Sequence, residues 1–181
     1  MEARDILKAT LFTDDSERAY AVIDGAACDE LLDQLNQHSP DYCCLYPGEL
    51  EPDMESVAPY LVALHPEQPF TDWLLASLPG KPWGILVRST ATIRQLRKHF
   101  RAFLNVKNEA GENLYFRYYD PRVIRIFLPT CDTEQFETFF EPVTEYIAEA
   151  EGGTFMAYRY RDGKLQGHVL AESPTAYREI N

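Results

Sequence analysis

The chain of 181 residues lacks the short motifs that identify common enzyme classes. It contains no GxSxG, P-loop or HExxH pattern, and its four histidines are scattered outside any motif. No CxxC pair and no group of cysteine and histidine occurs at zinc-ligand spacing. We therefore expect a protein that is not an enzyme and that needs no cofactor or metal.

Long hydrophobic runs are also missing. No apolar stretch approaches the roughly 18 residues that a membrane span requires. The N-terminus, MEARDILKATLF, has neither the basic start nor the apolar core and cleavage site of a signal peptide. We expect a soluble, cytoplasmic protein that does not bind membranes.

Cysteine is rare, with four residues in the chain: Cys28, Cys43, Cys44 and Cys131. Adjacent cysteines on a strand point to opposite faces, so Cys43 and Cys44 suit neither a shared metal nor a mutual disulfide. The sequence predicts buried free thiols in a reducing compartment.

Positive charge is scarce at both ends of the chain, whose net charge is −12. Residues 1–80 hold 3 basic and 16 acidic side chains, and residues 132–181 hold 4 and 10. Residues 81–131 instead hold 10 basic and 3 acidic side chains. This middle block either pairs with the acidic flanks inside the fold or gives a surface that steers a charged partner. An acidic chain repels phosphate, so we expect no nucleic-acid partner.

What the sequence does have is a series of apolar segments that predict strands and helices in turn. Hydrophobic residues make up 45% of the chain, which is ample for a core. Strands are predicted over residues 19–24, 42–46, 60–64 and 83–88, and helices over residues 28–37, 70–78 and 89–104, the last capped by Ser89 or Thr90.

Residues 114–128, LYFRYYDPRVIRIFL, are rich in the aromatic and β-branched residues that favour strands. We predict two short strands joined at Asp120-Pro121, because proline cannot donate to a strand ladder. Arg117, Arg122 and Arg125 interrupt this apolar run. They either lie on the solvated face and pair with local acids, or form a platform that presents arginine and tyrosine to a partner.

The last third predicts one helix and one hairpin. A helix starts at Asp132 or Thr133 and is kinked or divided at Pro142. Its apolar stripe comprises Phe136, Phe139, Phe140, Val143 and Ile147. Acidic residues every four positions give this helix a ridge of Glu137, Glu141, Glu145 and Glu149. Residues 154–160 and 165–170 flank Asp162-Gly163 and predict a hairpin.

Together these elements indicate an α/β or α+β fold, with a mixed β-sheet and helices packed on its faces. The connections allow one parallel strand pair, whereas the hairpins require antiparallel ones. At this length we expect a single compact domain over residues 1–181.

A family resemblance is found in six blocks that follow one another along the chain. They are AYAVIDGA (19–26), LYPGEL (45–50), APYLVAL (58–64), KPWGILVRS (81–89), LRKHFRAFL (96–104) and RYYDPRVIRIFLPTC (117–131). In this order they resemble the adaptor family of bacterial type VI secretion, the Tap or Tec effector chaperones. The resemblance extends over residues 19–147, and residues 148–181 add a hairpin and tail.

The resemblance implies a non-enzymatic adaptor that binds one toxic effector protein in the cytoplasm and passes it to the spike protein VgrG. Many members have a further helical C-terminal lobe, which we expect to be short or missing because this chain stops at Asn181. The candidate partner-binding residues are those of the arginine–tyrosine block and of the basic helix face: Arg117, Tyr119, Asp120, Arg122, Arg125, Arg94, Arg97, Lys98 and Arg101.

Two points stay open at this stage. Asp120 and Arg122 either contact the partner or clamp each other around the Pro121 bend. The alternative function is a small cytoplasmic enzyme with an unrecognised site, in which Asp24, at the end of a predicted strand, would act with Arg88 or Arg117. A closed pocket of perturbed carboxylates would favour that alternative, and an open groove of aromatic and arginine side chains would favour the adaptor.

Overall fold

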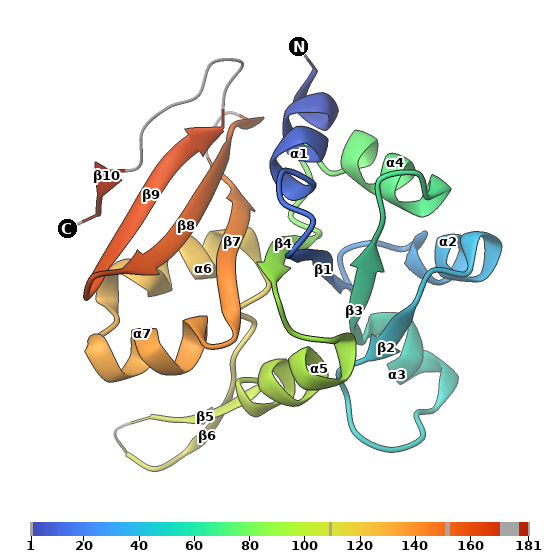
Figure 1. The fold of residues 1–181 in the computed structure, drawn as a ribbon. Coiled ribbons are helices and arrows are strands. Elements are labelled where there is room, and N and C mark those ends of the chain that lie inside the picture. Colours follow the sequence, from blue (N-terminus) through green and yellow to red (C-terminus); the bar gives the residue numbers. More distant parts are fainter. Residues whose placement is uncertain (1, 109, 151–152, 171–177, 181) are drawn as a thin grey trace.

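Two apolar strands, β1 (Arg18–Asp24) and β4 (Gly84–Ser89), lie side by side in the middle of the sheet. The computed structural model describes residues 2–108, 110–150, 153–170 and 178–180. Within these residues eight strands form one sheet in the order β10-β9-β8-β7-β4-β1-β3-β2 (Figure 1). The other six strands are β2 (Tyr42–Cys44), β3 (Pro59–Leu64), β7 (Val143–Glu149), β8 (Phe155–Arg161), β9 (Lys164–Leu170) and β10 (Arg178–Glu179).

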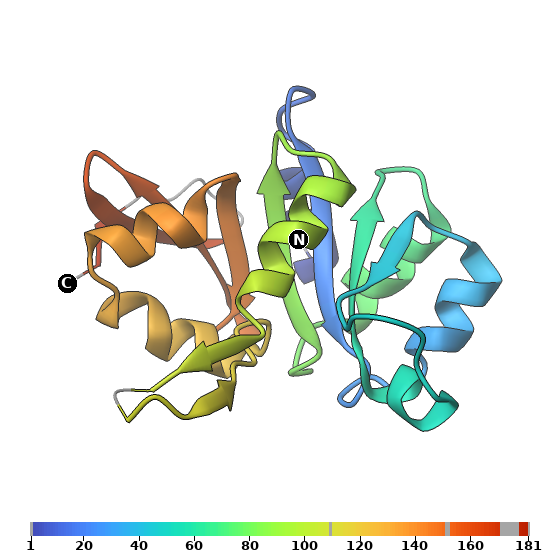
Figure 2. The ribbon, with the colours of Figure 1, turned by 90° about the horizontal axis from the view of Figure 1, so that it is seen from below.

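Helices cover both faces of this sheet (Figures 1 and 2). One face packs against α1 (Ala3–Leu11), α2 (Leu31–His38) and α4 (Pro69–Ser77). The other packs against α5 (Ile93–Ala102), α6 (Pro121–Phe127) with its 3₁₀ extension η1 (Leu128–Thr130), and α7 (Thr133–Phe140). The short α3 (Pro52–Val57) precedes β3, and β5 (Asn105–Lys107) with β6 (Asn113–Tyr115) forms a separate hairpin.

The predicted mixture of sheet and covering helices is thus confirmed. Every strand pair among the described residues is antiparallel, so the parallel pair that the connections allowed is not found there. In the middle of the sheet, β1 runs opposite to both of its neighbours, β3 and β4.

Alternation along β1 explains why it needs cover on both sides. Ala19, Ala21 and Ile23 point into the core beneath α1, α2 and α4, whereas Tyr20 and Val22 point into the core beneath α5, α6 and α7. Successive side chains of a strand face opposite ways, so burying both sets requires two helical layers. The same alternation separates the two adjacent cysteines: Cys44 packs against the first core and Cys43 against the second.

The turn after β1 depends on Gly25. A Cβ atom at this position would lie 2.6 Å from the Ala58 carbonyl oxygen and 2.7 Å from that of Ser56. The Gly25 amide donates to the same Ala58 oxygen over 2.9 Å. The absence of a side chain therefore lets β1 end close against the entry to β3.

The prediction of two strands in residues 114–128 is wrong for the second half. β6 ends at Tyr115, and Pro121 opens a helix. The Asp120 side chain accepts from the Arg122 amide over 2.8 Å and caps that helix, while Pro121 supplies a helical φ at its first position. Ile124 and Leu128, four residues apart, are then both fully buried in the second core.

The helix predicted through Pro142 is also shorter than expected. The Asp132 capping box starts α7, which ends at Phe140, and Val143 to Ile147 belong to β7. Pro142 therefore ends the helix and does not kink it. The four glutamates therefore do not lie on one helix, and the predicted acidic ridge is wrong. Glu137 is exposed on α7, whereas the side chain of Glu145, on β7, is 1% exposed.

Smaller differences concern two short helices and the segment ends. The helices α1 and α3 lie outside the predicted elements. Thr92 caps α5 in place of Ser89 or Thr90, because Ser89 still pairs with Arg18 in the sheet. The expected 154–170 hairpin is present as β8 and β9, with the turn at Asp162 and Gly163.

The buried position of Glu145 leads to a stability prediction. Its carboxylate accepts from Arg88 Nη1 over 3.2 Å and from Arg159 Nε over 2.9 Å. Arg88 also pairs with Glu17 over 2.5 Å. Glu145→Ala removes the buried carboxylate that both arginines share, so it should cost about 3 kcal/mol of unfolding free energy. The control is Glu137→Ala on α7, which should change stability by less than about 0.5 kcal/mol. Equal losses of stability for the two variants in urea denaturation would contradict the buried position of Glu145.

Candidate functional site

An ion pair connects the segment after β6 to the central sheet. Arg117 Nη2 donates to Asp24 Oδ2 at the C-terminal end of β1, and Asp24 Oδ1 accepts from the Ala26 amide over 3.0 Å. Asp24 is buried, whereas the Arg117 side chain is 46% exposed. Burial opposes charge on Arg117, but the carboxylate of Asp24 outweighs it and raises the arginine pKa. Arg117 therefore anchors the loop and leaves part of its side chain at the surface.

The tyrosines of this segment point mainly inward. The Tyr118 hydroxyl donates to the Phe100 carbonyl oxygen over 3.0 Å, and the hydroxyls of Tyr115 and Tyr119 lie 3.0 Å apart. Tyr119 is buried, and burial raises its pKa to about 12. Of the predicted arginine–tyrosine platform, Tyr119 thus lies beneath the surface, and Tyr115 is the tyrosine that is exposed there.

Asp120 and Arg122 clamp each other. Arg122 Nε donates to Asp120 Oδ1 over 3.0 Å and Arg122 Nη2 to Oδ2 over 2.6 Å. Burial raises the Asp120 pKa, but the hydrogen bonds and charge of Arg122 outweigh it, so the carboxyl pKa lies below its usual value. The Arg122 side chain is still 67% exposed. Arg125, on the same helix, is half-buried, and among the described residues its Nε atom has no hydrogen-bond partner.

The basic side chains of α5 lie on its outer side, as predicted. Leu96 and Phe100 are buried beneath the helix. A shallow depression of about 320 Å³ is lined by Arg94, Arg97, Lys98 and Arg101. Within the described part of the chain none of the four forms an ion pair with a carboxylate, and Arg97 Nε donates to the Cys44 carbonyl oxygen over 3.3 Å. Internal pairing therefore accounts for Arg88, Arg117 and Arg122, but not for α5.

His99 lies on the inner flank of α5, against α7. Its Nε2 atom is 3.1 Å from the Phe139 carbonyl oxygen. Burial lowers the His99 pKa to about 4, so the ring is neutral at neutral pH and joins the two helices. Burial also raises the thiol pKa of Cys28, Cys43 and Cys131 to about 11, which keeps these cysteines protonated.

An apolar hollow of about 470 Å³ was not anticipated from the sequence. It lies between the β5–β6 hairpin, α6 and α7, and its aromatic lining comprises Phe103, Phe116, Phe127 and Phe139. These four phenylalanines come from four separate segments, so no periodicity within one segment could have indicated them.

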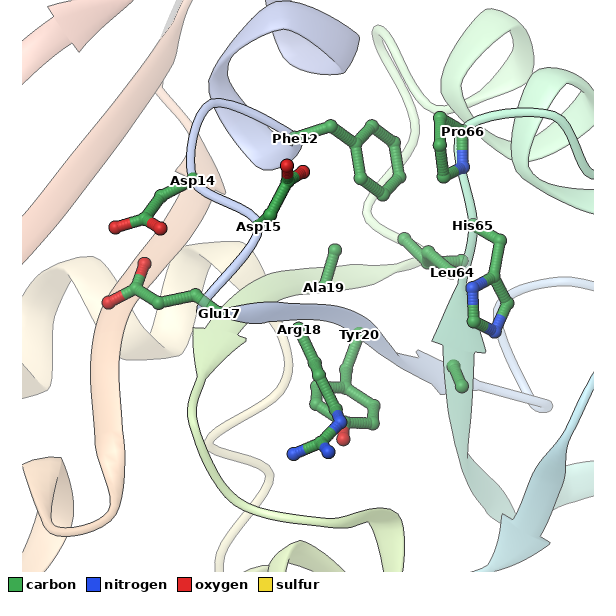
Figure 3. Close-up of a pocket in the computed structure, with 11 residues that line it drawn as sticks. Phe12, Asp14, Asp15, Glu17, Arg18, Ala19, Tyr20, Leu64, His65 and Pro66 are labelled. Atoms are coloured by element: carbon green, nitrogen blue, oxygen red, sulfur yellow. The ribbon is translucent and has the colours of Figure 1, made fainter.

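A further pocket of about 410 Å³ lies at the opposite end of β1 (Figure 3). Arg18 and Tyr20 extend to the side of the strand opposite Phe12 and Asp15. Arg18 Nη1 donates to the Thr90 carbonyl oxygen over 2.7 Å, and the Tyr20 hydroxyl donates to that of Ala91 over 2.7 Å. The polar groups of this pocket therefore do not converge on one point.

Of the three residues named for the enzymatic alternative, Asp24, Arg88 and Arg117, only two form an ion pair with each other. Asp24 contacts Arg117, whereas Arg88 pairs with Glu17 over 2.5 Å and with Glu145 over 3.2 Å. No group of three or more His, Cys, Asp or Glu side chains in the described ranges has the geometry of a metal site. A search of the same ranges for a helix of membrane-spanning length and hydrophobicity finds none.

Comparison with known protein families gives a match over most of the chain. A family model described as a domain of unknown function, DUF4123, matches residues 19–138, about two thirds of the chain. The chain therefore belongs to this family. The matched region runs from β1 into α7 and includes every candidate partner-binding residue. No curated protein and no solved structure matches the chain.

The clamp geometry predicts how Asp120 and Arg122 differ in their effects on stability. Asp120→Ala removes the cap of α6 and should cost about 1–2 kcal/mol of unfolding free energy. Arg122→Ala leaves the cap in place, so its effect should be smaller. Urea denaturation of both variants tests this order, and a larger loss for Arg122→Ala would show that the capping argument is wrong.

Proposed function

We propose that the protein is a type VI secretion adaptor of the Tap or Tec kind, which binds an effector protein in the cytoplasm and helps to load it onto the VgrG spike. The observation that supports this most is the DUF4123 match over residues 19–138, since that family is known as an effector chaperone domain of type VI secretion.

The surface chemistry supports a role in protein binding. Arginine and aromatic side chains dominate interface hot spots, because they combine a large contact area with directional polar groups. Three features lie in elements that cover the same face of the sheet. They are the α5 cations, which form no ion pair with any residue that the structure describes, the exposed side of Arg122 and the phenylalanine hollow.

We further propose that the protein works by binding and not by catalysis. Asp24, the candidate catalytic carboxylate, has both oxygens engaged, one by the Ala26 amide and one by Arg117. A general base must come within hydrogen-bond reach of its substrate, and Asp24 is buried. These contacts favour a structural role for Asp24.

The test is affinity purification of the tagged protein from its own bacterium, followed by mass spectrometry of the proteins that copurify. The adaptor function predicts recovery of one large effector, with or without VgrG. The control is the same purification from cells that lack the gene of the recovered effector. Recovery of the tagged protein alone, from cells shown to produce the secretion system, would contradict the proposal.

A further inference from the structure

Three hollows adjoin one another beside α5 and share lining residues, and we call the three together the α5–α7 groove. The first is the basic depression on the outer side of α5. The second, of about 700 Å³, lies between α5 and α7 and shares Lys98 with the first. The third is the apolar hollow, which shares Phe103 and Thr138 with the second. The groove therefore runs from four cationic side chains to a cluster of aromatic rings.

The apolar end of the groove is only partly covered. Phe116 and Phe127 contact each other with ring centroids 4.8 Å apart, and Phe127 lies 5.4 Å from Phe139. Phe116 and Phe127 are half-buried. Leu114 stands across from Val106 in the β5–β6 hairpin and is 47% exposed, which extends the apolar surface. Exposed apolar surface next to a hollow favours the burial of a partner's apolar side chains.

The two sides of the groove differ in charge. On the α5 side, Lys98 lines the middle hollow, and Arg94, Arg97 and Arg101 line the adjoining depression. These four cations form no ion pair among the described residues, in a chain whose net charge is −12. The α7 wall has the exposed acids Glu134, Glu137 and Glu141. Since unpaired cations attract carboxylates and the acidic wall repels them, an occupant should be acidic on one flank only.

The spacing of the α5 cations would match a row of acidic residues on a second helix that lies beside α5. Arg94, Lys98 and Arg101 follow at intervals of four and three residues on α5, a span of about 10 Å at 1.5 Å per residue. Acidic residues at the same intervals on a second helix form a row of equal length. An apolar stripe on that helix would lie toward the phenylalanines, as in other helix-in-groove complexes.

We propose that the α5–α7 groove binds an amphipathic helix of the effector, with its apolar stripe over the phenylalanine hollow and one acidic flank against α5. This rests on the adaptor function proposed above and adds where the effector binds and which chemistry its binding segment has.

The test is a fluorescence anisotropy titration with a labelled model helix of about 18 residues, at low ionic strength. The probe has a leucine and phenylalanine stripe, glutamates along one flank and glutamine elsewhere. We expect it to bind, and we expect binding to be lost when lysine replaces the glutamates or glutamine replaces the stripe. Equal binding of the lysine peptide, or no binding of the probe, would overturn the proposal.

Two pairs of variants locate the binding surface. Arg94→Glu with Lys98→Glu should weaken binding of the probe about tenfold. The same charge change at Arg4 on α1 and at Lys81 in the loop before β4 should not. Leu114→Ser should weaken binding, whereas Met54→Ser should not, although Met54 is equally exposed, at 48%. Identical affinities within each pair would overturn the proposed groove.

The affinity purification separates this inference from the adaptor function. If a client copurifies equally well with the Arg94→Glu/Lys98→Glu variant, the groove is overturned and the adaptor function stands. If no client copurifies but the probe binds with the expected variant effects, the groove stands without the adaptor function. Single-stranded DNA is a competitor in the same titration. If it displaces the probe, if its binding is weakened by the same variants, and if probe binding does not need the apolar stripe, the groove binds nucleic acid and the proposed protein helix is overturned.

Discussion

The structure depends on covering both faces of two apolar strands, β1 and β4. Each sends alternate side chains into two separate cores, so neither face can be left to water. This constraint places α1, α2 and α4 on one side and α5, α6 and α7 on the other. Because α5 packs through Leu96 and Phe100, its cations are held outward, which is the feature on which the proposed binding surface rests.

The ion pair of Arg117 with Asp24 has a second positioning role. It fixes the segment after the β5–β6 hairpin to the end of β1, while Phe116 N donates to the Leu104 carbonyl oxygen over 2.9 Å. The hairpin is therefore attached at both ends, to α5 and to the sheet. In this position the hairpin forms one side of the phenylalanine hollow. The ion pair at the end of β1 thus helps to position an apolar surface outside the sheet.

Local signals predicted the central part of the fold well. The apolar runs of β1 and β4 and the Asp-Gly turn of the last hairpin are encoded by neighbouring residues. Residues 121–127 were misjudged because Val, Ile and Phe favour strands, whereas the Asp120-Pro121 pair is also a helix start. The strand after Pro142 was missed because its apolar residues also fit a helical stripe until the proline ends it.

The candidate site shows the same limit. The basic face of α5 was predictable from one helix, and the Asp120–Arg122 clamp was one of two stated alternatives. The inward orientation of Tyr119 and the phenylalanine hollow depend on contacts between segments far apart in sequence, such as Phe103 with Phe139. Such contacts exist only after the helices have packed.

Hydrogen–deuterium exchange of the protein, alone and bound to its copurified client, tests most directly whether the α5, α6 and α7 side of the molecule is the partner-binding face. The account predicts slower exchange in α5, α7 and the β5–β6 hairpin, and unchanged exchange in α1, α2 and α4. Slower exchange confined to α1, α2 and α4 would contradict it.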